Sequence, residues 1–358
     1  MTNEGAASGD AGDDVTGRGR TGRDATKRPL PPTACSALSE ALEEPMAGTA
    51  ANATTWLCIE QSGPYGADAL TESHFDPILG AELAARVKGT GVRVQLIRRP
   101  GRHADRHLDE GAQHSDRRTV YVAHTRPGGT WIHKGAFDDL TKLLSFDFEA
   151  LAAGVEPQTW GRRDDTPLML VCSNGRRDVC CAVLGRPIAA ELARRHPDGT
   201  VWETTHTGGH RLAPTAVVLP TGYLYGRLDI EHADRVLSQA RRGLMVVDRC
   251  RGRSTWTAPG QVAELAVREL IDEPLPDVVR VEAEEPGEPA VEDDPAIPYA
   301  AQSDRRGWRV RASAAGREFV VWGREEVLRP ERRTSCAKAP VTPTAHQVTR
   351  VEETTPAG

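Results

Sequence analysis

The sequence lacks any apolar run close to the roughly 18 residues that a membrane-spanning helix needs. Its first 28 residues are polar and rich in glycine, without the apolar core of a secretion signal. We therefore expect no membrane span and a cytoplasmic location.

Aromatic residues are also scarce, at 5% of the chain, and the net charge is −6. A surface that stacks single-stranded bases needs aromatic side chains, and a basic protein favours a nucleic-acid partner. The sequence meets neither condition, so we expect no nucleic-acid partner. With 358 residues, 39% of them hydrophobic and 27% charged, the chain can bury the cores of two domains.

The chain has seven cysteines at irregular spacing, with no C-x-x-C pair. An odd, irregular set is a poor disulfide framework. In a reducing compartment, such cysteines more often bind metal or take part in redox chemistry. The cysteine pattern therefore indicates thiols that bind metal or take part in redox chemistry.

Soft ligands gather in two short segments, 172–181 and 206–210, which hold three thiols and two imidazoles. The apolar residues 168–171 and the alternating residues 201–205 precede them and predict two buried strands. Loops at strand ends commonly carry binding groups on a rigid scaffold. We therefore predict that the two segments form one site.

The second segment reads His-Thr-Gly-Gly-His. Gly208 and Gly209 would each cost a helix roughly 1 kcal/mol, so we predict a tight loop shaped by glycine. The helix of a zinc protease needs a glutamate directly after its first histidine to act as general base. Thr207 stands at that position, which excludes this chemistry.

Two longer segments, 54–150 and 165–275, show the same order of predicted elements. Each predicts strand, helix and strand, followed by a β-hairpin and a helix, which is typical of a thioredoxin-like domain. We predict an α/β fold of two such units packed together. The second unit carries the soft ligands, whereas the first has Gln-Ser-Gly-Pro-Tyr-Gly at the corresponding loop, 61–66.

The remaining segments are predicted from their composition. Residues 1–50 have little periodic apolar content and predict a mostly disordered tail, with a short helix at 36–44 that directly follows Cys35. The acidic, proline-containing segment 282–300 predicts a linker. Residues 305–353 predict a small β-rich region with a hairpin that turns at 314–316.

Two cysteines and two histidines suit a tetrahedral zinc site. They equally suit a 2Fe–2S cluster with cysteines on one iron and histidines on the other. Zinc-finger cysteines usually stand about two to four residues apart. Eight residues separate Cys172 from Cys181, which favours the bulkier cluster.

Several motifs resemble the sucrase/ferredoxin-like family over roughly 35–230. They are Cys-Ser-Asn-Gly-Arg-Arg-Asp-Val-Cys-Cys-Ala, His-Thr-Gly-Gly-His-Arg and Leu-Tyr-Gly-Arg-Leu, with 56–66 and 96–102 in the first unit. The resemblance implies a thioredoxin-like ferredoxin whose 2Fe–2S cluster is held by Cys172, Cys181, His206 and His210. Cys180 is the alternative to Cys181 as the second thiol ligand.

The resemblance implies an electron carrier rather than an enzyme with its own substrate. No G-x-G-x-x-G motif follows a predicted strand, so the expected electron donor is a separate flavin- or NADPH-dependent reductase. No carboxylate pair is marked for glycoside chemistry; Asp229 and Glu231 are more typical of a helix start. Glu203 and Arg211 flank the histidines and are expected to hydrogen-bond an imidazole or to form salt bridges.

Two other functions remain open on the same residues. The first is a thiol–disulfide oxidoreductase, with a reactive thiol near a helix N-terminus, where the helix dipole lowers the thiol pKa. The second is an interaction protein with a structural zinc site.

Overall fold

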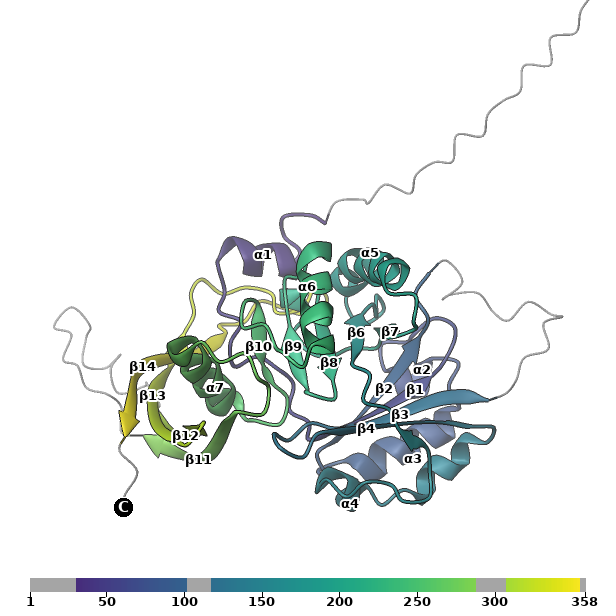
Figure 1. The fold of residues 1–358 in the computed structure, drawn as a ribbon. Coiled ribbons are helices and arrows are strands. Elements are labelled where there is room, and N and C mark those ends of the chain that lie inside the picture. Colours follow the sequence, from purple (N-terminus) through teal and green to yellow (C-terminus); the bar gives the residue numbers. More distant parts are fainter. Residues whose placement is uncertain (1–29, 102–116, 288–306, 355–358) are drawn as a thin grey trace, which may run out of the picture.

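The computed structural model describes residues 30–101, 117–287 and 307–354. Within them, the strands form a ten-stranded mixed sheet and a four-stranded antiparallel sheet (Figure 1). The α/β class predicted from the sequence is confirmed.

The first half of the large sheet and its helices comprise β1 (Thr55–Glu60), α2 (Ala69–Glu72), α3 (Pro77–Val87), β2 (Val92–Arg98), β3 (Arg118–His124), β4 (Trp131–Phe137), η1 (Leu140–Ser145), α4 (Phe148–Ala152) and β5 (Arg162–Arg163). The second half comprises β6 (Leu168–Cys172), α5 (Val179–Arg195), β7 (Val201–Thr204), η2 (His210–Leu212), β8 (Ala216–Leu219), β9 (Tyr223–Tyr225), α6 (Ile230–Arg241) and β10 (Cys250–Arg253).

The strand order of the large sheet is β10-β9-β8-β6-β7-β2-β1-β3-β4-β5. In the first half, β1 pairs in parallel with β2 and antiparallel with β3, which pairs antiparallel with β4. The second half repeats this pattern with β6, β7, β8 and β9. The halves meet where β2 pairs antiparallel with β7, at Ile97↔Thr204 and Arg98↔Glu203. The predicted repetition of elements is therefore present in the strand order.

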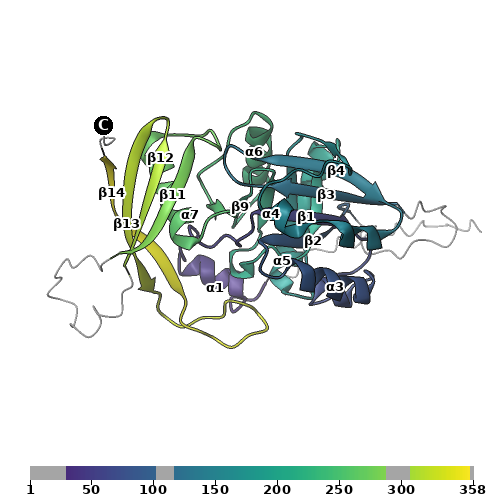
Figure 2. The ribbon, with the colours of Figure 1, turned by 90° about the horizontal axis from the view of Figure 1, so that it is seen from below.

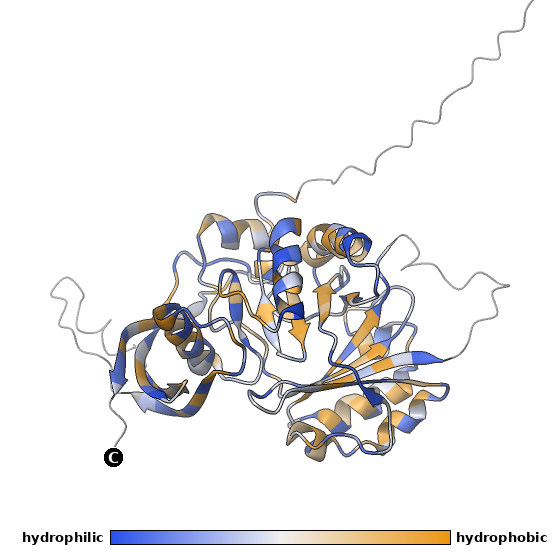
Figure 3. Cartoon of the chain, viewed as in Figure 1, coloured by the Kyte–Doolittle hydropathy of each residue, from blue (hydrophilic) through white to orange (hydrophobic). Residues whose placement is uncertain are grey.

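Helices cover the outer face of each half (Figure 1). In the first half, Leu79 and Leu83 of α3 pack on Leu57 and Leu96. In the second half, the covering residues come from α5 and α6 and include Ile188, Leu192, Val236 and Leu237. Figure 3 shows the same division, with apolar strands and a polar outward surface on α6.

The other faces of the two halves pack against each other. Trp56 and Tyr121 of the first half share one buried cluster with Leu170, Trp202 and Val217 of the second. The rings of Tyr121 and Trp202 meet edge to face, with centroids 5.9 Å apart. This shared core stabilises one half against the other, because each buries apolar area that it would otherwise expose to water.

The C-terminal region forms the small sheet, whose strands are β11 (Val279–Gly287), β12 (Gly307–Ala314), β13 (Arg317–Val327) and β14 (Thr344–Thr354). Helix α7 (Ala258–Ile271) packs against this sheet and against β10 (Figure 2). The hairpin predicted at 314–316 is present between β12 and β13.

Two predicted boundaries are wrong. The acidic segment predicted as a linker from residue 282 begins inside β11, where pairing with β12 outweighs its charge, and 288–306 lie outside the described residues. Residues 30–50, predicted as part of a disordered tail, are ordered and include α1 (Cys35–Ala41); Cys35 is fully buried. Residues 1–29 lie outside the described part of the chain.

Candidate metal centre

The site lies where β6 and β7 end. These strands are parallel neighbours, and the last residue of each, Cys172 and Thr204, are paired across them. Because parallel strands end at the same edge of a sheet, the loops that follow them converge. His206, two residues beyond Thr204, is therefore brought beside Cys172.

Helix α5 brings the second thiol. Its N-cap is Asp178, whose side chain accepts a hydrogen bond from the Cys180 amide at 3.0 Å. This cap places Cys181 in the first helical turn. One turn later, Gly185 lies so close to β6 that a Cβ there would stand 2.1 Å from the Cys172 carbonyl oxygen. The glycine thus allows the close approach that brings the two thiols together.

The histidine loop has the glycine-shaped form predicted from its sequence. Gly208 and Gly209 have φ of +93° and +73°, which residues with a Cβ rarely adopt. The turn they make stacks the rings of His206 and His210, with centroids 4.2 Å apart and planes 21° from parallel.

Three of the four predicted ligands form a compact group. Cys172, Cys181 and His206 each offer one ligand atom within 4.8 Å of the others. His210 lies outside that group but stacks on His206. Both thiols are fully buried, whereas the two imidazoles are half-buried and form the outer side of the site.

The two thiols have opposite tendencies to ionise. The Cys181 thiol donates a hydrogen bond that, with the nearby His206, holds the pKa of Cys172 well below its usual value. The pKa of Cys181 is raised well above its usual value by the same hydrogen bond and by burial. Burial and the neighbouring His206 lower the pKa of His210 to about 4, which keeps that imidazole neutral at pH 7. These shifts favour the thiolate at Cys172, the thiol at Cys181 and a neutral imidazole at His210.

The residues fit a soft metal or an iron–sulfur group. The Nδ1 atoms of His206 and His210 are buried and have no hydrogen-bond partner among the described residues. Buried polar atoms normally have such a partner, and an unpaired one calls for an explanation. Ligation of a metal through these nitrogens would supply it, since thiolates and imidazoles are ligands for zinc, copper and iron–sulfur clusters.

Cys180 points away from this group. Its Sγ lies 3.7 Å from that of Cys35 and 3.4 Å from that of Cys336. Sequence reasoning missed these two neighbours because they are 301 residues apart and share no spacing motif. The geometry thus favours Cys181 over Cys180 as the partner of Cys172.

The charged residues beside the histidines form salt bridges rather than contacts with imidazole. Glu203 accepts hydrogen bonds from Arg98 at 2.7 Å and from Ser173 at 2.7 Å. Arg211 pairs with the buried Glu44. Of the two roles expected for Glu203 and Arg211, the structure shows the salt bridge.

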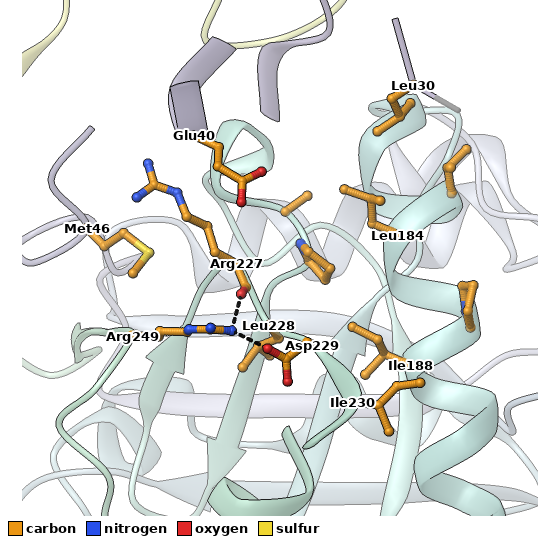
Figure 4. A pocket seen from close by; sticks show the side chains of 14 residues that line it. Leu30, Glu40, Met46, Leu184, Ile188, Arg227, Leu228, Asp229, Ile230 and Arg249 are labelled. Atoms are coloured by element: carbon orange, nitrogen blue, oxygen red, sulfur yellow. Dashed lines mark hydrogen bonds and ion pairs between the residues drawn. The ribbon is translucent and has the colours of Figure 1, made fainter. Parts of the chain in front are cut away.

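A separate pocket of about 720 Å³ lies between α1, α5 and the segment before α6 (Figure 4). Its described lining contains neither cysteine nor histidine. Arg249 there donates to the Arg227 carbonyl oxygen at 2.8 Å and to Asp229 at 2.7 Å. Asp229 also accepts from the His232 amide as the N-cap of α6, as predicted. These pairings are structural and leave the pocket outside the metal centre.

Buried thiols and stacked imidazoles at the ends of parallel strands define a candidate metal-binding protein of the α/β class. Among the described residues, the helices are too short or too polar to cross a bilayer. The family model described as Suc_Fer-like, sucrase/ferredoxin-like, matches residues 46–252, so the chain belongs to this family. The same comparisons found no matching curated protein and no matching solved structure.

Proposed function

We propose that this protein is a ferredoxin-like electron carrier that holds a 2Fe–2S cluster with Cys172, Cys181, His206 and His210. The observation that carries the proposal is the meeting of two buried thiols with two stacked imidazoles whose Nδ1 atoms lack hydrogen-bond partners in the described structure. Membership of the family supports it. When bound, such a cluster accepts and releases single electrons.

The thiol and imidazole ligands differ in burial, and this difference indicates which side of the site is open to a partner. The fully buried Cys172 and Cys181 face the core, where they are kept from oxidants and from solvent. His206 and His210 are half-buried and so lie on the more exposed side of the site. The imidazole edge is therefore the side from which electrons enter and leave, toward a donor and an acceptor docked on this surface.

The protonation of the thiols also suits ligand binding. The lowered pKa of Cys172 favours its thiolate, whereas the raised pKa of Cys181 favours the protonated thiol in the absence of a metal. Both thiols must be deprotonated to act as ligands, so binding releases a proton from Cys181.

We interpret each half of the large sheet as a thioredoxin-like unit. The order β9-β8-β6-β7, with one parallel and two antiparallel pairings, supports this in the second half. The first half repeats it with β4-β3-β1-β2. The proposed donor is a flavin- or NADPH-dependent reductase, and the proposed location is the cytoplasm.

A single zinc ion is the second candidate occupant. The specific observation in its favour is that the ligand atoms of Cys172, Cys181 and His206 lie within 4.8 Å of one another, a spacing that suits one ion. In that case the protein is an interaction module with a structural site.

Iron, zinc and acid-labile sulfide analysis of the freshly purified chain, with its absorption spectrum, tests the proposal. We expect equal amounts of iron and sulfide and absorption between about 400 and 600 nm. A colourless chain with zinc at this site would support the structural alternative. A colourless, metal-free chain with a reducible disulfide would support the thiol oxidoreductase.

A further inference from the structure

A second cluster of ligands lies beside the proposed centre and outside its donor set. Cys35 at the start of α1, Cys180 in the first turn of α5 and Cys336 in the segment before β14 bring their sulfur atoms together around Asp178. The sulfur–sulfur distances are 3.7 Å between Cys35 and Cys180, 3.4 Å between Cys180 and Cys336, and 3.6 Å between Cys336 and Cys35.

These distances match the edges of a tetrahedral zinc site. A Zn–S bond of about 2.3 Å in tetrahedral geometry separates two sulfur atoms by about 3.8 Å, and a Zn–O bond of about 2.0 Å gives a sulfur–oxygen edge of about 3.5 Å. The Oδ2 atom of Asp178 lies 3.6 Å from the Cys35 sulfur. An iron–sulfur cluster with a cysteine on each of several irons would spread the three thiolates further apart.

The surroundings point to a ligand site rather than to ordinary core packing. Cysteine is a common small apolar core residue, and Ala34, Ala213 and Leu184 do pack around these thiols. Packing of small apolar side chains does not require a carboxylate, yet Asp178, the N-cap of α5, is 3% exposed and lies among the three sulfur atoms.

Backbone and hydroxyl groups hold the carboxylate and one sulfur in place. Asp178 accepts hydrogen bonds from the Cys336 amide at 2.8 Å and from the Ser335 hydroxyl at 3.0 Å. The Cys35 amide donates to the Cys336 sulfur at 3.4 Å. Such donors orient ligands and offset the negative charge that thiolates bring to a metal.

We propose that Cys35, Cys180, Cys336 and Asp178 form a second metal site, which binds zinc and fastens the N-terminal and C-terminal segments to the start of α5. Zinc has no redox chemistry of its own, so this site holds the segments without taking electrons. Its α5 ligand, Cys180, directly precedes Cys181 of the proposed cluster. The two sites thus share one helical turn but no ligand.

An independent contact joins the N-terminal and C-terminal segments to each other and to η2, after the histidine loop. The buried Glu44 pairs with Arg332 at 3.0 Å and with Arg211 beside the histidine loop. This contact keeps the segments together when a thiol is substituted, so Cys35→Ser and Cys336→Ser variants are expected to fold.

The test is zinc and iron analysis of the full chain, purified under reducing conditions without metal-affinity resin. We expect one zinc per wild-type chain, lost in Cys35→Ser and in Cys336→Ser, with iron unchanged. The matched control is Cys58→Ala, which removes a buried thiol in the core shared by the two halves, where none of the proposed ligands lies, and should keep both metals. Cys172→Ser should lose iron and keep zinc, so that failure of either site is visible separately.

A wild-type chain that takes up no zinc, or thiol variants that keep it, would overturn the proposal. A wild-type chain whose mass is lower by two hydrogens because of a disulfide among these cysteines would also overturn the proposal. Should a variant fail to fold, cobalt(II) added to the wild-type chain under reducing conditions provides a second measurement. Thiolate-to-cobalt absorption that zinc displaces is expected; its absence would refute the site.

Discussion

The two halves of the large sheet share a strand order but differ in the loop that follows the first strand. In the second half this loop begins after Cys172 and leads to Cys181. In the first half the loop is 61–66, without cysteine or histidine. The scaffold therefore presents a strand-end loop in both halves, and the side chains of that loop decide whether it offers metal ligands.

The loop of the first half nevertheless supports the site of the second. The Gly66 carbonyl oxygen accepts a hydrogen bond from the Asn174 side chain at 3.1 Å. The Gly63 carbonyl oxygen accepts one from Arg98 at 2.7 Å. The loop that leads from Cys172 to Cys181 is thus bonded to its counterpart in the first half through Asn174.

The largest expected effect comes from removing a thiol of the second half. Cys172→Ser and Cys181→Ser should abolish iron binding and lower stability, because a metal site contributes its binding energy to the fold. Cys58→Ala, which removes the buried thiol of β1, should keep the iron. Cys180→Ser should keep the iron as well. Loss of iron in Cys180→Ser but not in Cys181→Ser would show that Cys180, and not Cys181, is the second thiol ligand.

The contact between the halves can be broken at Glu203. Its carboxylate pairs with Arg98, and both side chains are 2% exposed. Glu203→Gln leaves a buried guanidinium without its counter-charge, and removing one partner of a buried pair costs about 3–5 kcal/mol. Urea unfolding would measure the loss. A decrease in the free energy of unfolding below about 1 kcal/mol, which is the range of exposed ion pairs, would show that this pair does not stabilise the contact between the halves.

Two glycines give a matched test of helix position. Gly185 in α5 and Gly80 in α3 both leave no room for a Cβ, which would stand 2.1 and 2.0 Å from a backbone carbonyl oxygen. Alanine at either position should cost about 1–3 kcal/mol through overpacking. Gly185→Ala should also reduce iron content, because it separates α5 from Cys172. Equal iron content in both variants would contradict the role of α5 in placing Cys181.

The smallest effect is expected at helix starts that have no part in the site. Asp76 caps α3 and Asp229 caps α6. Replacing either aspartate with alanine should cost about 0.5–2 kcal/mol and leave the iron content unchanged. Thermal unfolding with iron analysis checks this; loss of iron in Asp229→Ala alone would give that acid a role at the metal centre.

Local patterns predicted much of this structure. The alternation and apolar runs of the strands, the Asp229 cap and the glycines of the histidine loop each depend on neighbours in the sequence, and each is present as predicted. The order of elements also predicted the repeat, because both halves carry it along the chain.

The rest depends on contacts between distant segments. The ordered N-terminal segment is explained by Glu44, whose partner Arg332 lies 288 residues away. The grouping of Cys35 with Cys336 has the same origin, and so has the pairing of the halves through Arg98 and Glu203. The strand at 279–287 was not predicted because its acidic residues are typical of a linker. The backbone hydrogen bonds to β12 that make it a strand do not depend on those side chains.

Pulsed electron paramagnetic resonance of the reduced chain, with unlabelled and ¹⁵N-labelled histidine, tests the central claim most directly. Two strongly coupled imidazole nitrogens are predicted, since the stacked His206 and His210 both have buried Nδ1 atoms without a hydrogen-bond partner among the described residues. Both couplings should change with the label, and each should disappear on substitution of one histidine. A reduced signal without strongly coupled histidine nitrogen, or no paramagnetic signal from a fully loaded chain, would contradict the account.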